Sequence, residues 1–289
     1  MSVDENTKLK SRITLLESEL TAKNAEVATY RQEMLKFSQK LDVLMSQIAQ
    51  DMKILSEVQK TLVPTEIPNI PGFEISRKFV FGSKVGGDYF DIFEHEDKFK
   101  FGILVASSSG YAMSALFLSL IIKVSHVLEA KKGNSPEKIL QQLAEEIKKL
   151  AGPVDQTSGF YAVIDRRSFQ LQFCSAGQVD GYYWAPQKAL QVLKSSHGAF
   201  SQQFADKLTL ASLDLEPKSR LCVVTPGLSE VLGADRIAKI INDNSKNGVH
   251  DLRNELLFQA QRVAQKEEPI RDQTVVVIEV KDRVIKLAK

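Results

Sequence analysis

The sequence is poor in cysteine and histidine, with 2 cysteines and 4 histidines among 289 residues. Cys174 and Cys222 lie far apart, inside apolar, strand-like stretches. This pattern favours buried thiols in a reducing compartment over a disulfide framework or a cysteine metal site. The histidines are scattered without ligand spacing. We therefore expect a cytoplasmic protein.

Long apolar runs and an excess of charge are also missing. No stretch of about 20 apolar residues occurs, which argues against a membrane span. The longest apolar run, around 113–128, is interrupted by Lys123 and His126 and is typical of an amphipathic buried helix. The N-terminus has no signal-like pattern, so we expect no export. A net charge of +2 argues against a dedicated nucleic-acid binder.

Residues 1–60 contain neither proline nor glycine, and their apolar residues recur every seven positions. One set is Ile13, Leu20, Val27, Met34, Leu41, Ile48 and Leu55, and the other is Leu9, Leu16, Tyr30, Phe37, Leu44 and Val58. Lys23 and Asp51 interrupt the second set. This heptad pattern predicts a coiled-coil helix rather than an amphipathic helix folded onto its own domain. A helix with one apolar stripe needs a partner, and the simplest partner is a second copy. We expect a homodimer; strand number and direction stay open.

A short proline-rich joint, residues 61–73, follows the helix, with prolines at 64, 68 and 71. Proline ends helices and favours extended backbone, so the joint is expected to be stiff. A globular domain then spans 74–281, and a tail spans 282–289. Strand-like segments alternate with two helical regions, at 111–150 and 235–266. The pattern predicts an α+β fold, two sheets flanked by helices.

One run in the globular domain combines glycine flexibility with acidic side chains: Val85-Gly86-Gly87-Asp88-Tyr89-Phe90-Asp91. Glycines let backbone approach an ion closely, and carboxylates are ligands that Mg²⁺ or Mn²⁺ prefers. On a strand, Asp88 and Phe90 share one face, and Tyr89 and Asp91 share the other. A bulge beside an exposed acid is the plainer interpretation of these residues alone.

Residues 59–280 resemble the PPM (type 2C) protein phosphatases of the bacterial SpoIIE/RsbU group. Six motifs, in the family's order, carry the resemblance. They are Gln59 to Pro64, Val85 to Asp91, Ser109 to Leu116, Ser175 to Gln178, Thr225 to Glu230 and Arg271 to Ile278. The resemblance implies a PPM-type β-sandwich flanked by helices. It also implies a site where a cluster of acidic residues holds two metal ions that activate a bridging water.

Three departures from the family motifs fall on the expected metal ligands. The resemblance keeps one acid, Asp88, and puts Ser107, Pro226 and Arg271 where the family has aspartates. Asp88 with the backbone carbonyl of Tyr89 is a poor basis for metal binding, because Mg²⁺ demands near-ideal oxygen geometry. We therefore expect no catalytic residues and no cofactor.

Arg271 has two interpretations, which the sequence leaves open. In the first, its guanidinium pairs with Asp88 and occupies the space of the metals, because the family brings both positions to the same ions. In the second, Arg271 is a solvated surface residue in a shifted loop.

The sequence therefore predicts a catalytically inactive, dimeric regulatory or protein-binding module in bacterial partner-switching. The resemblance implies a STAS-domain anti-sigma-factor antagonist as a partner. The alternative is an atypical Ser/Thr phosphatase that uses Mg²⁺ or Mn²⁺ with relocated ligands such as Asp91, Asp97 or Asp272. A third hypothesis assigns the work to the coiled coil, with the globular domain as a rigid dock.

Overall fold

A computed structural model of the protein describes residues 3–62, 66–83, 87–109, 118, 120, 122–123, 133–265 and 268–281. The chain divides into two compact units, residues 1–54 and residues 55–289. Most of the helix predicted at 111–132, the tail 282–289 and the motif residues Val85, Gly86 and Gly110 lie outside the described residues. No described helix has the length and apolar character that a bilayer crossing requires.

The N-terminal segment forms one uninterrupted helix, α1 (Val3–Leu62), which ends two residues after the predicted segment. Its continuity follows from the lack of proline and glycine, which break or weaken helices. The apolar side chains of the heptad pattern are exposed, for example Ile13 at 52%, Met34 at 68% and Phe37 at 59%. The side chain of Leu55 lies outside the described part. The coiled coil and the homodimer stay predictions.

The globular unit is built on two five-stranded sheets. One sheet, here sheet A, has the spatial order β1 (Phe73–Val80), β10 (Gln273–Val280), β9 (Arg220–Val224), β6 (Asp180–Trp184) and β7 (Gln191–Leu193). Sheet B has the order β2 (Gly87–Glu94), β3 (Lys100–Ser109), β4 (Gln156–Asp165), β5 (Gln170–Ala176) and β8 (Ala211–Asp214). All neighbouring strands are antiparallel. The α+β architecture with two sheets confirms the predicted fold class.

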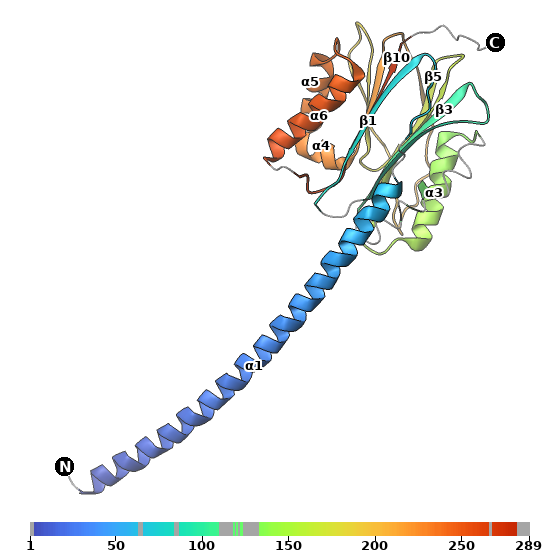
Figure 1. The fold of residues 1–289 in the computed structure, drawn as a ribbon. Helices are drawn as coiled ribbons and strands as arrows, with labels where there is room; N and C mark the ends of the chain where they lie inside the picture. Colours follow the sequence, from blue (N-terminus) through green and yellow to red (C-terminus); the bar gives the residue numbers. More distant parts are fainter. Residues whose placement is uncertain are drawn as a thin grey trace. The chain divides into compact units, whose positions relative to one another are not determined.

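Helices cover the outer faces of both sheets (Figure 1). α3 (Pro136–Leu150) packs on sheet B, whereas α4 (Pro226–Leu232), α5 (Ala234–Asp243) and α6 (Val249–Ala264) pack on sheet A. Between the sheets lies an apolar core that includes Phe90, Phe160, Val223 and Val276. This core holds the two sheets face to face, so residues at matching strand ends meet across it.

Two elements were not anticipated from the sequence. α4 begins at Pro226, directly after Thr225, in the segment that the family motif covers. Proline suits the first helical position, because its fixed φ is helical and its missing N–H would have no helical partner. β8 is a short, mostly exposed edge strand that pairs only with β5 among the described strands. Its sequence carries little apolar alternation, so only the neighbouring strand defines it.

Candidate functional site

Asp88 lies near the start of β2 and faces sheet A across the sandwich. Its face is shared with Phe90, which belongs to the core between the sheets, whereas Tyr89 packs in the cluster beneath α3. The predicted alternation along this strand is therefore confirmed. Asp88 is 3% exposed. A buried carboxyl group must find polar partners in the protein, since leaving it without them is costly.

The partners of Asp88 on sheet A are two threonines. Its Oδ2 accepts hydrogen bonds from the Thr225 hydroxyl at 2.6 Å and from the Thr274 hydroxyl at 2.9 Å. The backbone N–H of Thr274 donates to Thr225 Oγ1 at 2.9 Å. Because that N–H occupies one lone pair of Thr225 Oγ1, the single hydroxyl proton of Thr225 is directed at Asp88. The two threonines thus form a fixed pair of donors to one carboxyl oxygen.

The position of this cluster follows from strand pairing. In sheet B, Asp88 pairs with Ser107, and Ser107 pairs with Ser158, so polar residues line up across three strands. The Ser107 hydroxyl also hydrogen-bonds to the Asp88 carboxyl. In sheet A, Thr225 follows β9 directly, and its N–H donates to Thr274 O at 3.1 Å. One end of the sandwich therefore gathers one carboxyl group and three hydroxyls from β2, β3, β10 and the residue after β9.

Asp272 is the second acid at this end, and it is 2% exposed. Its Oδ1 accepts the backbone N–H of Gly82 at 2.9 Å, and its Oδ2 accepts the N–H of Asp88 at 3.4 Å. Burial, and then repulsion from the Asp272 carboxylate, raise the pKa of Asp88 to about 7, although hydrogen bonds from the three hydroxyls oppose the shift. Burial and repulsion by a like charge both disfavour the ionised form of a carboxyl.

The backbone that precedes Asp272 is clamped between two glycines. A Cβ at Gly82 would lie 2.5 Å from the carbonyl carbon of Arg271, and one at Gly227 would lie 2.0 Å from the carbonyl oxygen of Asp272. Neither position has room for a side chain. The Gln273 amide donates to Gly227 O at 3.0 Å and joins the same loop to α4. The two glycines therefore let the backbone of Arg271 and Asp272 pass close to Gly82 and Gly227 and fix its position.

Arg271 does not pair with Asp88. Its guanidinium donates to Glu230 on α4 at 2.6 Å, and both side chains are partly exposed. The hypothesis that Arg271 fills the space of the metals is wrong, because the loop geometry sends its side chain outward while Asp272, the next residue, points inward. The interpretation of Arg271 as a surface residue is the better one, with an ion pair that the sequence did not predict.

The other predicted positions are spread over the domain. Ser107 lies in β3 beside Asp88, Pro226 is buried at the first position of α4, and Tyr89 pairs with Ala106 in the β2–β3 ladder. Asp91 accepts hydrogen bonds from the Tyr89 hydroxyl and from Ile92 N, on the face of β2 opposite Asp88.

Among the three relocated ligands considered, Asp272 alone contacts Asp88. Asp97 lies beyond the far end of β2 and forms an ion pair with Arg167 at 3.1 Å. Asp91 and Asp97 therefore cannot join Asp88 at one ion without a rearrangement of the strand.

The described residues do not fit a pair of metal ions. No group of three His, Cys, Asp or Glu side chains is placed to hold a metal within the described ranges. The two acids that do meet are already engaged, one by hydroxyl donors and the other by backbone N–H groups. A divalent cation needs oxygen lone pairs directed at it, whereas these oxygens face donors. The described residues therefore give no basis for a metal-dependent chemical step.

Sequence reasoning identified Asp88 but not the hydroxyls that hold it. Thr225 and Thr274 lie in two of the family motifs, and the sequence alone predicts no contact for either residue. Each follows or lies within a β-branched strand on sheet A, and each faces inward with every second residue of its strand. Placing them opposite Asp88 requires the packing of one sheet on the other, which strand periodicity alone does not supply.

Comparisons with known proteins agree with this fold. Residues 97–281 match the family described as Stage II sporulation protein E (SpoIIE). The phosphoserine phosphatase RsbU of Bacillus subtilis is 24% identical over 147 residues, 51% of this chain and 43% of RsbU. The chain therefore matches less than half the length of this curated relative.

Two solved structures share the fold at low sequence identity. The SiaA-PP2C domain of Pseudomonas aeruginosa superposes with a TM-score of 0.67 at 18% identity, over 82% of this chain and 98% of that domain. RsbX in complex with magnesium gives a TM-score of 0.61 at 18% identity, over 75% of this chain and 99% of RsbX. Because the family match covers well over half of the chain, this protein belongs to the SpoIIE family of PP2C-type phosphatase domains.

Proposed function

We propose that this chain is a catalytically inactive member of its family that works as a dimeric, protein-binding regulatory module. One observation carries the proposal: Asp88, the one acid kept at an expected ligand position, is bound by hydroxyls of the protein itself. Ser107, Thr225 and Thr274 satisfy its carboxyl group in the way that cations would in a metal-dependent relative. The site is then a hydrogen-bonded connection between the two sheets.

Electrostatics supports the same proposal. Two metal ions would stabilise ionised carboxylates, whereas here burial and Asp272 raise the pKa of Asp88. The substitutions at Ser107, Pro226 and Arg271 remove three negative charges and add one positive charge relative to the family pattern. A site with so little negative charge offers weak attraction to divalent cations, and water activation by metal needs the cations in place.

The binding role rests on surface rather than on the site. α1 presents a long apolar stripe that is exposed in the single chain, and a second copy is the simplest cover for it. The resemblance to regulators of partner-switching makes a STAS-domain antagonist the first partner to test. A cytoplasmic location stays a prediction; Cys174 and Cys222, both buried free thiols, are consistent with it.

A second candidate is an atypical metal-dependent Ser/Thr phosphatase. The observation that favours it is the approach of Asp272 to Asp88, which gives two carboxyl groups at one end of the sandwich. RsbU is named a phosphoserine phosphatase, and RsbX has been solved with magnesium. For this candidate, a cation would have to bind Asp88 through Oδ1 or displace the threonine hydroxyls from Oδ2.

Calorimetric titration of the full chain with Mn²⁺, paired with hydrolysis of a phosphoserine peptide, tests the proposal. We expect neither metal binding nor turnover. The matched comparison is the double variant Ser107→Asp with Pro226→Asp, which returns two acids of the family pattern and is expected to gain Mn²⁺ binding; Arg271, whose side chain turns outward to Glu230, is left unchanged. Turnover by the unaltered chain that needs Mn²⁺ and is lost in Asp88→Ala would establish the second candidate instead.

A further inference from the structure

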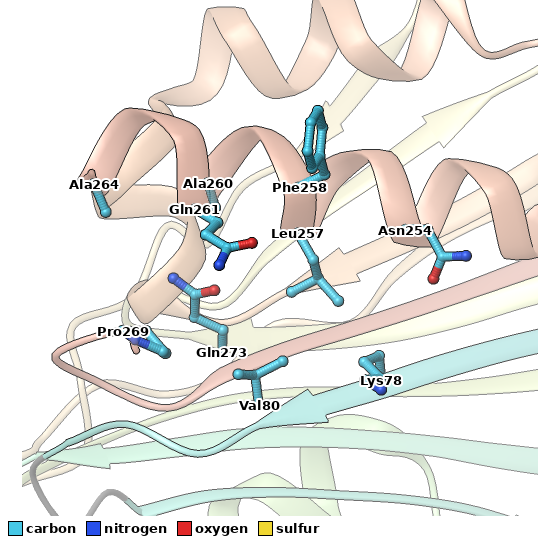
Figure 2. Close-up of a pocket in the computed structure, with 10 residues that line it drawn as sticks. All are labelled: Lys78, Val80, Asn254, Leu257, Phe258, Ala260, Gln261, Ala264, Pro269 and Gln273. Carbon is cyan, nitrogen blue, oxygen red and sulfur yellow. The ribbon is translucent and has the colours of Figure 1, made fainter. Parts of the chain in front are cut away.

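A surface groove runs between α6 and β1, the edge strand of sheet A, with a cavity volume of about 300 Å³. Leu257 reaches from α6 toward Val80 on β1, and the side chains of Gln261 and Gln273 face each other (Figure 2). Gln273 directly precedes Thr274. Gln273 and Thr274 both belong to β10, so the groove lies on the outer face of β10, whose inner face contributes Thr274 to the cluster around Asp88.

The apolar residues of the groove are unusually open to solvent for a folded domain. Phe258, on α6, is 53% exposed, and Ile270, which follows the lining residue Pro269, is 48% exposed. Leu257 and Val80 are partly buried beneath them. Large aromatic and aliphatic side chains at a rim, with smaller apolar contacts below, are typical of the energetic centre of a protein interface.

The open form of the groove favours a polypeptide over a small molecule. Small-molecule sites enclose most of the ligand surface, whereas about half of Phe258 and of Ile270 already faces water. A helix or extended segment laid along the groove covers such side chains without needing an enclosed cavity.

Two basic side chains lie at the groove. Lys78 on β1 lines it, and Arg253 lies one turn before Leu257 on α6. Within the described part of the chain, neither forms an ion pair with a carboxylate. Arg253 also lies close enough to Arg77 that, after burial, its charge helps to lower the pKa of Arg77.

Lys78 and Arg253 give this side of the groove a positive charge. A negatively charged partner is attracted to such a surface before contact. Arg253 is fixed in place by its hydrogen bond to Arg77 O at 3.1 Å, so part of the basic rim is preorganised.

We propose that the groove between α6 and β1 is a docking site for an acidic, amphipathic segment of a partner protein. The bulky apolar side chains of the segment pack against Phe258, Leu257 and Val80, and its carboxylates face Lys78 and Arg253. The inference rests on the proposed function as a binding module, and it assigns that binding to a surface outside the degenerate catalytic site.

The test is selection of a random 16-residue peptide library displayed on phage against the immobilised full chain. We expect enrichment of peptides that combine acidic residues with bulky apolar ones. Synthetic versions are then titrated by fluorescence anisotropy against four proteins: the unaltered chain, Phe258→Asp, Lys78→Glu, and Leu150→Asp. Leu150, on α3 of the opposite face, is 52% exposed and serves as the matched control. We expect both groove variants to weaken binding at least tenfold and the control to leave it unchanged.

Enrichment of peptides without acidic residues would overturn the inference, and so would equal affinity for the unaltered chain and the Phe258→Asp variant. Circular dichroism of each variant shows whether it is folded, and the two groove variants change different residues, so one folding failure leaves the other informative. The outcome is separate from the catalytic test. Metal-dependent turnover would end the proposed function while peptide binding still reports on the groove, and a silent enzyme without peptide binding would end only the groove.

Discussion

The N-terminal helix and the end of the globular domain that holds Asp88 differ in the side chains that they expose and bury. α1 exposes apolar residues along much of its length, whereas the end of the sandwich buries two acids and several hydroxyls. Every hydroxyl and carboxyl group of the Asp88 cluster has a partner inside the domain. The apolar residues of the helix therefore need a covering surface that the single chain does not supply, whereas the Asp88 cluster finds all its hydrogen-bond partners within the domain.

This contrast indicates which surfaces of the protein are suited to binding partners. A long apolar stripe exposed to water carries a free-energy cost that association removes. On a straight helix a seven-residue repeat drifts by about 20° per heptad, and a left-handed supercoil keeps it facing a partner. The acidic cluster has no comparable deficit, because hydroxyls complete it. Binding is then expected at the helix and at apolar surface elsewhere, rather than at the Asp88 cluster.

The largest expected effect is on the oligomeric state. Leu41→Asp puts a charge into the predicted seam and is expected to convert an oligomer of at least two copies into monomers, because a buried unpaired carboxylate is strongly unfavourable. Leu35→Asp is the matched control, since Leu35 is 64% exposed on the same helix but lies off the seam. Light scattering after size exclusion measures both. A monomeric unaltered chain, or equal disruption by the two variants, would contradict the coiled coil.

A smaller effect is expected when Asp88 is removed in two different ways. Asp88→Ala leaves the hydroxyls of Thr225 and Thr274 without their acceptor, and buried unsatisfied groups cost about 1 to 3 kcal/mol each. Partial relief of repulsion from Asp272 offsets some of this. We expect a net loss of about 2 kcal/mol, which lowers Tm by about 4 to 8 °C in a domain of this size.

Asp88→Asn is the informative partner of that variant. The amide keeps an oxygen that accepts from both threonines, and it has no charge for Asp272 to repel. We expect a Tm at pH 8 equal to or above that of the unaltered chain. A structural hydrogen-bond cluster thus predicts opposite results for the two variants, whereas loss of stabilisation by Mn²⁺ in both would indicate a metal ligand.

The last comparison concerns pH, and it separates two buried titratable groups. His95 is 5% exposed, contacts the Tyr161 hydroxyl at 3.2 Å and stacks on Phe93. Burial, and then the charge of Lys100, lower its pKa to about 4. Between about pH 6.5 and pH 4 the unfolded chain binds a proton that the folded chain does not, so stability falls as pH falls, by up to about 1.4 kcal/mol per unit.

Asp88 acts with the opposite sign, because its raised pKa lets the folded state keep a proton that the unfolded state loses. Its contribution falls as pH rises from about 4 to about 7. Denaturant unfolding across pH 4 to 8 measures the sum. We expect His95→Gln to flatten the acid side of the profile and Asp88→Asn to flatten the neutral side. A profile that neither variant changes would show that these two groups titrate alike in both states.

Local sequence pattern was a good guide wherever one face of an element is buried. The helical region predicted at 111–150 contains α3, in which Ile139, Leu143 and Ile147 lie at the spacing of one helix face and are buried against sheet B. Alternation along β2 placed Asp88 and Tyr89 on opposite faces correctly. The pattern failed at β8, whose residues Ala211 and Ser212 are exposed. It also failed at α4, a helix of 7 residues that overlaps a family motif.

The sequence by itself determined the long helix, the strand faces and the non-acidic residues Ser107, Pro226 and Arg271, because these depend on residue type and on periods of 2, 3.6 and 7. Only the tertiary structure decided the partners. Thr225 and Thr274 reach Asp88, and Arg271 turns to Glu230, because two sheets pack face to face and two glycines fix the loop before Asp272. Contacts between strands more than a hundred residues apart depend on how layers pack, and no local period contains that information.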